Sequence, residues 1–241
     1  INPDGTLFRT PVGNEVNGTV QVDYYTAKGG AQETWEPVFT FHGFQHTALY
    51  VESGTLPEAP SNKTLTAVVV HTDLPETASF DCSDPQLVRL HEAAGRTLLA
   101  GMHGLPMDCP VRERCGWLGD GHVIAEALLT RYDAASFLHK YARDIETGGR
   151  RVTDEPRVGP NYGTIVREPK PAGIPHMIAP GKRRCNAASP DWGSAQVFIP
   201  WEICTQTGDM RILQEFLEPM RTWVGYLGSI ADPRTGLLVT G

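Results

Sequence analysis

The sequence lacks a long apolar run, because none of its apolar stretches approaches the roughly 18 residues that a membrane-spanning helix needs. It also lacks an excess of positive charge, since 21 basic side chains stand against 28 acidic ones and give a formal net charge of −7. The basic residues are scattered and form no patch that would bind a phosphate backbone. We therefore expect neither a membrane nor a nucleic acid as a partner.

Metal and redox motifs are also missing from the sequence. The five cysteines are unevenly spaced and include no Cys-x-x-Cys pair, and the eight histidines do not cluster at the spacing of metal ligands. No serine lies in the Gly-x-Ser-x-Gly context of a hydrolase elbow. Two glycosylation sequons, at Asn17 and Asn62, are too common by chance to place the protein in a compartment, so the localisation stays open. We expect no metal site.

The remaining composition is that of a globular protein, with 40% apolar and 20% charged residues over a length that suits one or two domains. Alternating or short apolar runs predict strands at 20–25, 38–41, 48–51 and 65–70. At Ser83, which can cap a helix, the period of the apolar residues changes from that of strands to that of helices. We predict an α+β chain with a β-sandwich segment over 1–78 and helices over 79–241.

Helical periodicity continues through the second part of the chain. After a first helix that starts near Pro85, the spacing of apolar residues predicts helices at 119–131, 134–148, 192–207 and 209–230. Between the second and third of these, residues 150–190 are rich in proline and show no periodicity, which predicts a long loop. Loops of that length in a compact domain are usually functional or mobile.

The densest group of chemically capable side chains lies at 108–120, which reads Asp-Cys-Pro-Val-Arg-Glu-Arg-Cys-Gly-Trp-Leu-Gly-Asp. Its proline and glycines predict a loop that runs into a helix from about residue 119. A sugar site needs acids to bind hydroxyls, an indole to stack on the C–H face of the ring, and one acid to protonate a leaving oxygen. On composition alone, a surface loop whose arginines form structural ion pairs with its acids fits these residues as well as a sugar site does.

The stretch 108–120 resembles the signature of the bacterial and fungal α-L-rhamnosidases. Further stretches resemble elements of the same family in the same order, at 35–44, 70–73, 80–85, 192–195, 200–201 and 207–209. Because these matches run from near the N-terminus to the C-terminus, they argue against a chance hit. The resemblance implies a β-sandwich followed by part of an (α/α)6 six-hairpin barrel, hydrolysis of terminal α-L-rhamnosides with inversion, and no organic cofactor.

By position, the resemblance makes Glu113 the general acid. The substrate-binding residues that it implies are Asp108, Arg112, Trp117, Asp120 and Trp192. A general acid must hold its proton, and a neighbouring guanidinium favours the ionised carboxylate. Because neighbours alternate in direction along an extended chain, we expect Arg112 and Arg114 to point away from Glu113.

A complete six-hairpin barrel needs more helices than the sequence predicts, and the family's general base, a Glu, lies far downstream of the acid. The resemblance therefore implies a barrel truncated before its second half, with the base beyond Gly241 and no activity in this chain alone. We expect a partner that covers the exposed inner helix faces: the rest of the barrel, a second fragment or another copy. Two alternatives remain, a lyase that cleaves rhamnosyl-uronate linkages on the same scaffold, and a non-catalytic sugar-binding or assembly fragment.

Overall fold

The computed structural model describes residues 21–30, 32–56, 58–150, 158–159, 163–164, 171–181 and 188–238. The chain divides into two compact units. The first unit comprises residues 1–70 together with Cys109–Arg114, and the second comprises His71–Asp108 together with Cys115–Gly241. The short segment 109–114 therefore belongs to the first unit, although it interrupts the second in sequence. The expected domain boundary after residue 78 stays a prediction.

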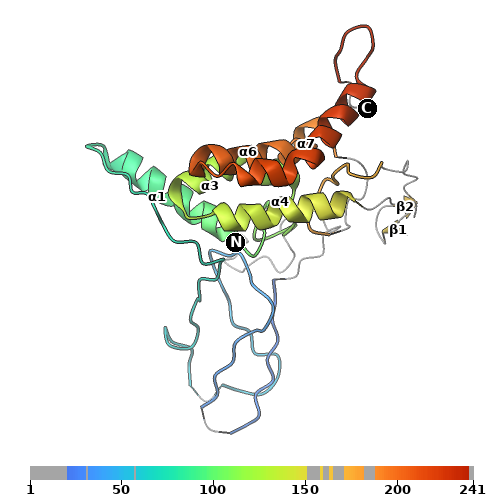
Figure 1. The fold of residues 1–241 in the computed structure, drawn as a ribbon. Coiled ribbons are helices and arrows are strands. Elements are labelled where there is room, and N and C mark those ends of the chain that lie inside the picture. The colour runs from blue at the N-terminus through green and yellow to red at the C-terminus, as the bar shows by residue number, and fades with distance from the viewer. Residues whose placement is uncertain are drawn as a thin grey trace. The chain divides into compact units, whose positions relative to one another are not determined.

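In the first unit, the described part of residues 21–70 is extended chain with turns and contains no regular strand (Figure 1). Strands predicted within this part are thus not confirmed. The inner faces of a sandwich bury alternate side chains between two sheets, but Tyr24 is 72% exposed, Val38 74% and Val69 85%. Since these side chains meet no facing layer, the β-sandwich stays a prediction.

The described residues of the second unit are mainly helical. Their seven helices are α1 (Pro85–Ala100), α2 (Leu118–Val123), α3 (Ala125–Arg131), α4 (Ala135–Gly149), α5 (Pro190–Gly193), α6 (Ala195–Thr207) and α7 (Arg211–Ile230). Two short strands, β1 (Val158–Gly159) and β2 (Gly163–Thr164), pair antiparallel. The rest of the predicted loop at 150–190 lies outside the described residues, except for 150, 171–181 and 188–190.

The first helix begins one residue later than its capping signal predicts. Asp84, and not Ser83, is the N-cap of α1, because its Oδ1 accepts a hydrogen bond of 2.8 Å from the backbone N of Gln86. Pro85 occupies the first helical position, where the missing N–H costs nothing.

Two of the predicted helices are each interrupted once. The predicted helix 119–131 consists of α2 and α3, which meet at Ile124, and the predicted helix 192–207 consists of α5 and α6, which meet at Ser194. The Ser194 hydroxyl donates to the backbone O of Pro190 at 2.5 Å and accepts from the indole N–H of Trp223 at 3.3 Å. A hydroxyl that bonds a carbonyl of the preceding turn bends a helix.

The core of the second unit forms where α6 packs against α3, α4 and α7 (Figure 1). Its fully buried large side chains include Leu118, Leu128, Leu138, Tyr141, Ile145 and Ile199. A smaller apolar cluster surrounds Trp223 and Ile174. Among the residues that the structure describes, no helix is both long enough and apolar enough to cross a membrane.

A buried arginine fastens the start of the second unit to its helices. Arg131 is 7% exposed, and its Nε donates to Glu76 Oε1 at 2.7 Å while its Nη1 donates to the backbone O of His91 at 2.5 Å. The guanidinium lies directly against Gly95, where any Cβ would collide with it. The chain that enters the unit is thereby held to α1 and α3.

Candidate functional site

The predicted loop at 108–120 closes on itself at its neck. The backbone N of Asp108 donates to the O of Cys115 at 3.1 Å, and the backbone N of Cys115 donates to Asp108 Oδ1 at 2.9 Å. The chain thus leaves the second unit after Asp108 and returns to the same place at Cys115. Asp108 is half-buried at this neck. Its Oδ1 has a structural role, because it accepts the hydrogen bond that closes the loop.

A described part of the long loop pairs with the residues that follow the neck. The backbone N of Leu118 donates to Met177 O at 3.0 Å, and the N of Ala179 donates to Gly116 O at 2.9 Å. Between these bonds, Trp117 pairs antiparallel with Ile178. Sequence reasoning missed this strap (residues 174–179), although its short, mainly apolar run between Pro175 and Pro180 was a usable signal.

Tyr141 of α4 holds the same stretch from the other side. Its hydroxyl lies 2.9 Å from the backbone O of Gly116 and 3.3 Å from that of Trp117, and its side chain has no exposed surface. Burial, and then the charges of Asp120 and Asp144, raise the pKa of Tyr141 well above its ordinary value. Tyr141 is therefore a protonated hydrogen-bond donor at neutral pH, and sequence reasoning missed it.

The start of α2 brings three of the predicted site residues together. Trp117 is the N-cap position of this helix and Asp120 lies in its first turn. The indole of Trp192 packs so closely on Gly119 that a Cβ there would lie 2.6 Å from Cε2. His122 of α2 is hydrogen-bonded to the backbone O of Asp191 at 2.9 Å, which ties α2 to α5. The residues Trp117, Asp120 and Trp192 thus lie at the same end of α2 in the second unit.

Arg112 and Glu113 lie in the first unit and form an ion pair with each other. Nη2 of Arg112 is 2.7 Å from Oε1 of Glu113, and the two side chains are 48% and 18% exposed. The prediction that Arg112 points away from Glu113 is wrong. It assumed an extended chain, but residues 110–113 form a turn, so neighbouring side chains do not alternate in direction.

Arg114 does take the predicted direction. Its Nε donates to the backbone O of Pro110 at 3.0 Å, and its guanidinium lies over the ring of Phe41 at 4.5 Å from the centroid. Burial lowers the pKa of Arg114 from its ordinary value, although the nearby Cys109 opposes this effect.

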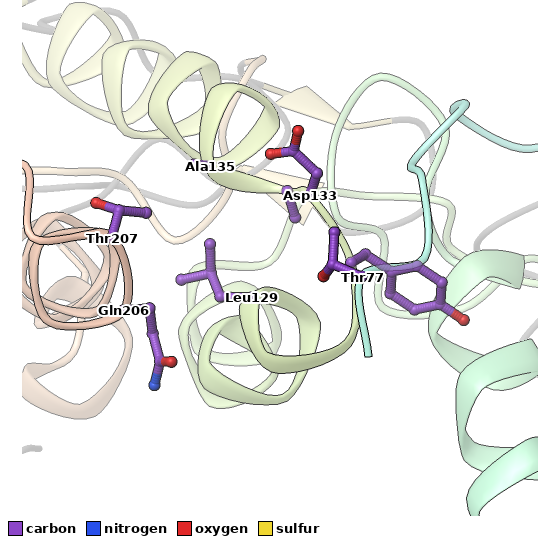
Figure 2. Close-up of a pocket in the computed structure, with 8 residues that line it drawn as sticks. Thr77, Leu129, Asp133, Ala135, Gln206 and Thr207 are labelled. Atoms are coloured by element: carbon purple, nitrogen blue, oxygen red, sulfur yellow. The ribbon is translucent and has the colours of Figure 1, made fainter. Parts of the chain in front are cut away.

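A cavity of about 150 Å³ in the second unit lies elsewhere (Figure 2). It is lined by Thr77, Leu129, Tyr132, Asp133, Ala134, Ala135, Gln206 and Thr207. None of these is a predicted site residue, and Asp133 is the one carboxylate among them, so the cavity lacks the acid pair of a glycosidase. In the described part of the chain, no three or more His, Cys, Asp or Glu side chains are grouped to hold a metal ion.

Two family models match the chain. The bacterial alpha-L-rhamnosidase 6 hairpin glycosidase domain matches residues 75–235, and the bacterial alpha-L-rhamnosidase concanavalin-like domain matches residues 1–71. Among curated relatives, an alpha-L-rhamnosidase from Formosa agariphila is 40% identical over 215 residues, which are 89% of this chain and 21% of the relative. Another from Streptomyces avermitilis is 34% identical over 237 residues, which are 96% of this chain and 20% of the relative.

Solved structures agree with these relatives. The Streptomyces avermitilis alpha-L-rhamnosidase complexed with L-rhamnose matches with a TM-score of 0.75 and 29% identity, over 96% of this chain and 20% of that one. The alpha-L-rhamnosidase from Dictyoglumus thermophilum matches with a TM-score of 0.62 and 25% identity, over 73% and 18%.

The chain spans about a fifth of the length of the curated relatives that it matches. The six-hairpin family model matches well over half of the residues of this chain. The order of motifs, the helical second unit and these matches lead to one assignment: the chain belongs to the bacterial α-L-rhamnosidase family, with a six-hairpin glycosidase domain.

Proposed function

We propose that this chain is part of an α-L-rhamnosidase that hydrolyses terminal α-L-rhamnosides with inversion, and that Glu113 is its general acid. The names of the relatives support the substrate class. The observation that carries the proposal is the gathering of Trp117, Asp120 and Trp192 at the start of α2. Flat indoles beside a carboxylate are the groups that bind a sugar ring and its hydroxyls.

In the proposed reaction, water attacks the anomeric carbon while the bond to the leaving oxygen breaks. Glu113 gives its proton to that oxygen, and a general base takes a proton from the water on the opposite face of the ring. Asp108 and Asp120 accept hydrogen bonds from sugar hydroxyls, and Trp117 and Trp192 provide apolar walls. The general base belongs to residues outside this chain.

The ion pair between Arg112 and Glu113 gives Arg112 a second duty. Nη2 of Arg112 lies 2.7 Å from Oε1 of Glu113 and therefore occupies one of the two oxygens of the acid. Arg112 must leave that oxygen before the acid can use it to reach the leaving oxygen of a substrate. We propose that Arg112 turns to a substrate hydroxyl on binding, which agrees with its expected substrate-binding role.

We propose a domain division that follows the same family. Residues 1–78 form part of a β-sandwich and residues 79–241 form the first half of an (α/α)6 barrel. The concanavalin-like match at 1–71 and the six-hairpin match at 75–235 support these roles. The remaining helices come from the rest of the barrel, a second fragment or another copy.

The test is Glu113→Gln in a chain that contains this sequence together with the rest of the barrel. Activity on rhamnosides with poor leaving groups should fall by about 10² to 10⁴-fold, the usual contribution of proton donation. An aryl rhamnoside with an acidic leaving group should be partly spared, and L-rhamnose should still bind. The matched control is Glu126→Gln on the exposed side of α3, which should change none of these.

Equal losses on both substrates, or no loss, would remove Glu113 from the acid role. An unsaturated product that absorbs in the ultraviolet would instead identify a lyase.

A further inference from the structure

We propose that Gln21, Phe41 and Gly43 form a cradle for Arg114, and that this cradle fixes the direction of the Glu113 side chain. Arg114 is then a positioning residue for the acid. This inference rests on the proposed function of Glu113, but its geometry lies entirely within the first unit. Through Arg114, residues 21–43 of that unit would then help to position the general acid.

The base of the cradle is a pairing between two extended stretches. The Gln21 side chain makes two hydrogen bonds to the backbone of Gly43: its Nε2 donates to Gly43 O and its Oε1 accepts from Gly43 N, both at 2.9 Å. This pair of hydrogen bonds resembles the pairing of two antiparallel strands. Two residues further along, Asp23 Oδ2 lies 2.8 Å from His42 Nε2. These bonds hold residues 21–23 beside residues 41–43.

The cradle then receives segment 109–114. Arg114 Nη2 reaches Gln21 Oε1 at 3.4 Å, and the guanidinium stacks over Phe41 at 4.5 Å. Gly43 makes room for the segment, since a Cβ at this position would lie 2.6 Å from Val111 Cγ2 and 3.3 Å from Pro110 Cγ. The Phe41 ring under the guanidinium and the bare backbone at Gly43 together define one position for the segment.

The backbone of Arg114 shows why this grip is needed. Its φ is +52°, in the left-handed region that a side chain with a Cβ rarely adopts. Such a conformation persists only where its surroundings hold it. The bond from Arg114 Nε to Pro110 O, and that from Glu113 N to Cys109 Sγ at 3.2 Å, close the turn whose end this residue forms. The direction of Glu113 is set by that turn.

The experiment has two readouts. In this 241-residue chain, hydrogen exchange is measured for peptides covering 109–115 and for peptides of α4. Arg114→Ala and Phe41→Leu should speed exchange in 109–115 by about tenfold or more, because each removes a cation–aromatic contact and Arg114→Ala also removes charged hydrogen bonds. Exchange in α4 should be unchanged. Phe41→Tyr, which keeps the aromatic face, should behave like the parent chain.

The second readout uses a chain that also carries the rest of the barrel. Both variants should lower kcat on poor leaving groups by up to about 10²-fold, the cost of misplacing a catalytic group by about 1 Å. They should spare an acidic leaving group and leave L-rhamnose binding intact. Arg221→Ala, which truncates an exposed arginine of α7, is the control and should do nothing.

The outcomes separate the two ideas. Unchanged exchange in 109–115, or an equal rise in α4, would overturn the cradle. Faster exchange without any change in leaving-group dependence, in a chain where Glu113→Gln is damaging, would overturn the positioning role alone. A harmless Glu113→Gln would overturn the proposed function itself, and with it the positioning role, whatever the exchange shows.

Discussion

At the scale of single residues, the Tyr141 hydroxyl is the contact whose removal is easiest to interpret. Tyr141→Phe deletes the donor to Gly116 O and Trp117 O and leaves the buried ring in place. The loss should lower the free energy of unfolding by about 1 kcal/mol, because a typical internal hydrogen bond contributes that much. Urea unfolding measures this, with Tyr226→Phe as a control in which the ring beside Trp223 is kept.

The same tyrosine gives a prediction at alkaline pH. Its folded pKa lies well above the ordinary 10.0, chiefly through burial. An unfolded chain releases this proton near its ordinary pKa while the folded chain keeps it. Stability is therefore complete below pH 10 and declines as the pH rises toward the folded pKa. Tyr141→Phe should show a shallower alkaline decline than the parent chain, and an identical slope would contradict the burial.

Asp209 carries the opposite shift. Its hydrogen bond with the Arg211 side chain, followed by that with the Arg211 backbone N, lowers the pKa of this carboxyl from 3.8 to about 2. A depressed folded pKa means that the stabilisation is present above pH 3.8 and is lost as the pH falls through about 2. Carboxyl carbon shifts followed by NMR should show that midpoint, and Arg211→Gln should return it toward 3.8.

Part of the site was predictable from residue types, since the stretch 108–120 is a loop that runs into a helix. Trp192, which packs beside that helix at Gly119, was implied only by the family resemblance. The direction of Arg112 was not predictable, because it depends on whether the chain extends or turns at 110–113. Tyr141 was missed because an apolar face of a helix gives no sign of which backbone its hydroxyl will reach.

At the scale of elements, the packing of α2 against α5 depends on the absence of a side chain at Gly119. A Cβ there would lie 2.6 to 3.0 Å from three atoms of the Trp192 indole. Gly119→Ala should therefore destabilise the chain by about 1–3 kcal/mol, as overpacking of a core does. In contrast, Gly225→Ala on α7, where nothing lies within 4 Å of the added carbon, should stabilise by about 0.5–1 kcal/mol.

Thermal unfolding of both glycine variants provides the comparison. If Gly119→Ala were as stable as the parent chain, the Trp192 indole would have to be free to move away from Gly119.

Helix positions followed closely from sequence periodicity. The predicted helices 134–148 and 209–230 correspond to α4 (Ala135–Gly149) and α7 (Arg211–Ile230). Apolar residues on one face of each helix determine such limits. The breaks at Ile124 and Ser194 were not predicted, because the Ser194 break involves a hydroxyl that contacts Trp223, far along the chain. The strap at 174–179 has no periodicity, so only its short run between Pro175 and Pro180 could have indicated it.

At the scale of the whole molecule, apolar side chains on the helices remain exposed. Phe198 and Trp201 of α6 are 45% and 52% exposed, and Val224 of α7 is 59% exposed. Exposed apolar surface of this kind is typical of faces that another chain or segment covers. The 241-residue chain alone should therefore associate, and under the proposed function, which places the general base outside this chain, it should not hydrolyse rhamnosides.

Light scattering combined with a rhamnoside assay tests both parts of this prediction. A monomer that turns over substrate would show that the general base lies within the chain.

The assignment of 109–114 to the first unit was beyond sequence reasoning. Both stretches, 35–44 and 108–120, were recognised separately, but the fit of Val111 against Gly43 depends on a contact between residues 68 positions apart. Local patterns carry no information on such a pairing. In the described part of 21–70, the predicted strands are not confirmed for a similar reason, because a strand needs a hydrogen-bonded neighbour as well as a suitable alternation.

The neck between Asp108 and Cys115 also matters for how such enzymes diverge. Because the chain departs and returns at one point, residues 109–114 can be exchanged as a whole without moving the helices on either side. Exchanges that keep the length of the segment would alter the neighbourhood of Glu113 while the hydrophobic core keeps its stability. The neck is therefore a suitable junction for libraries of exchanged loops of equal length.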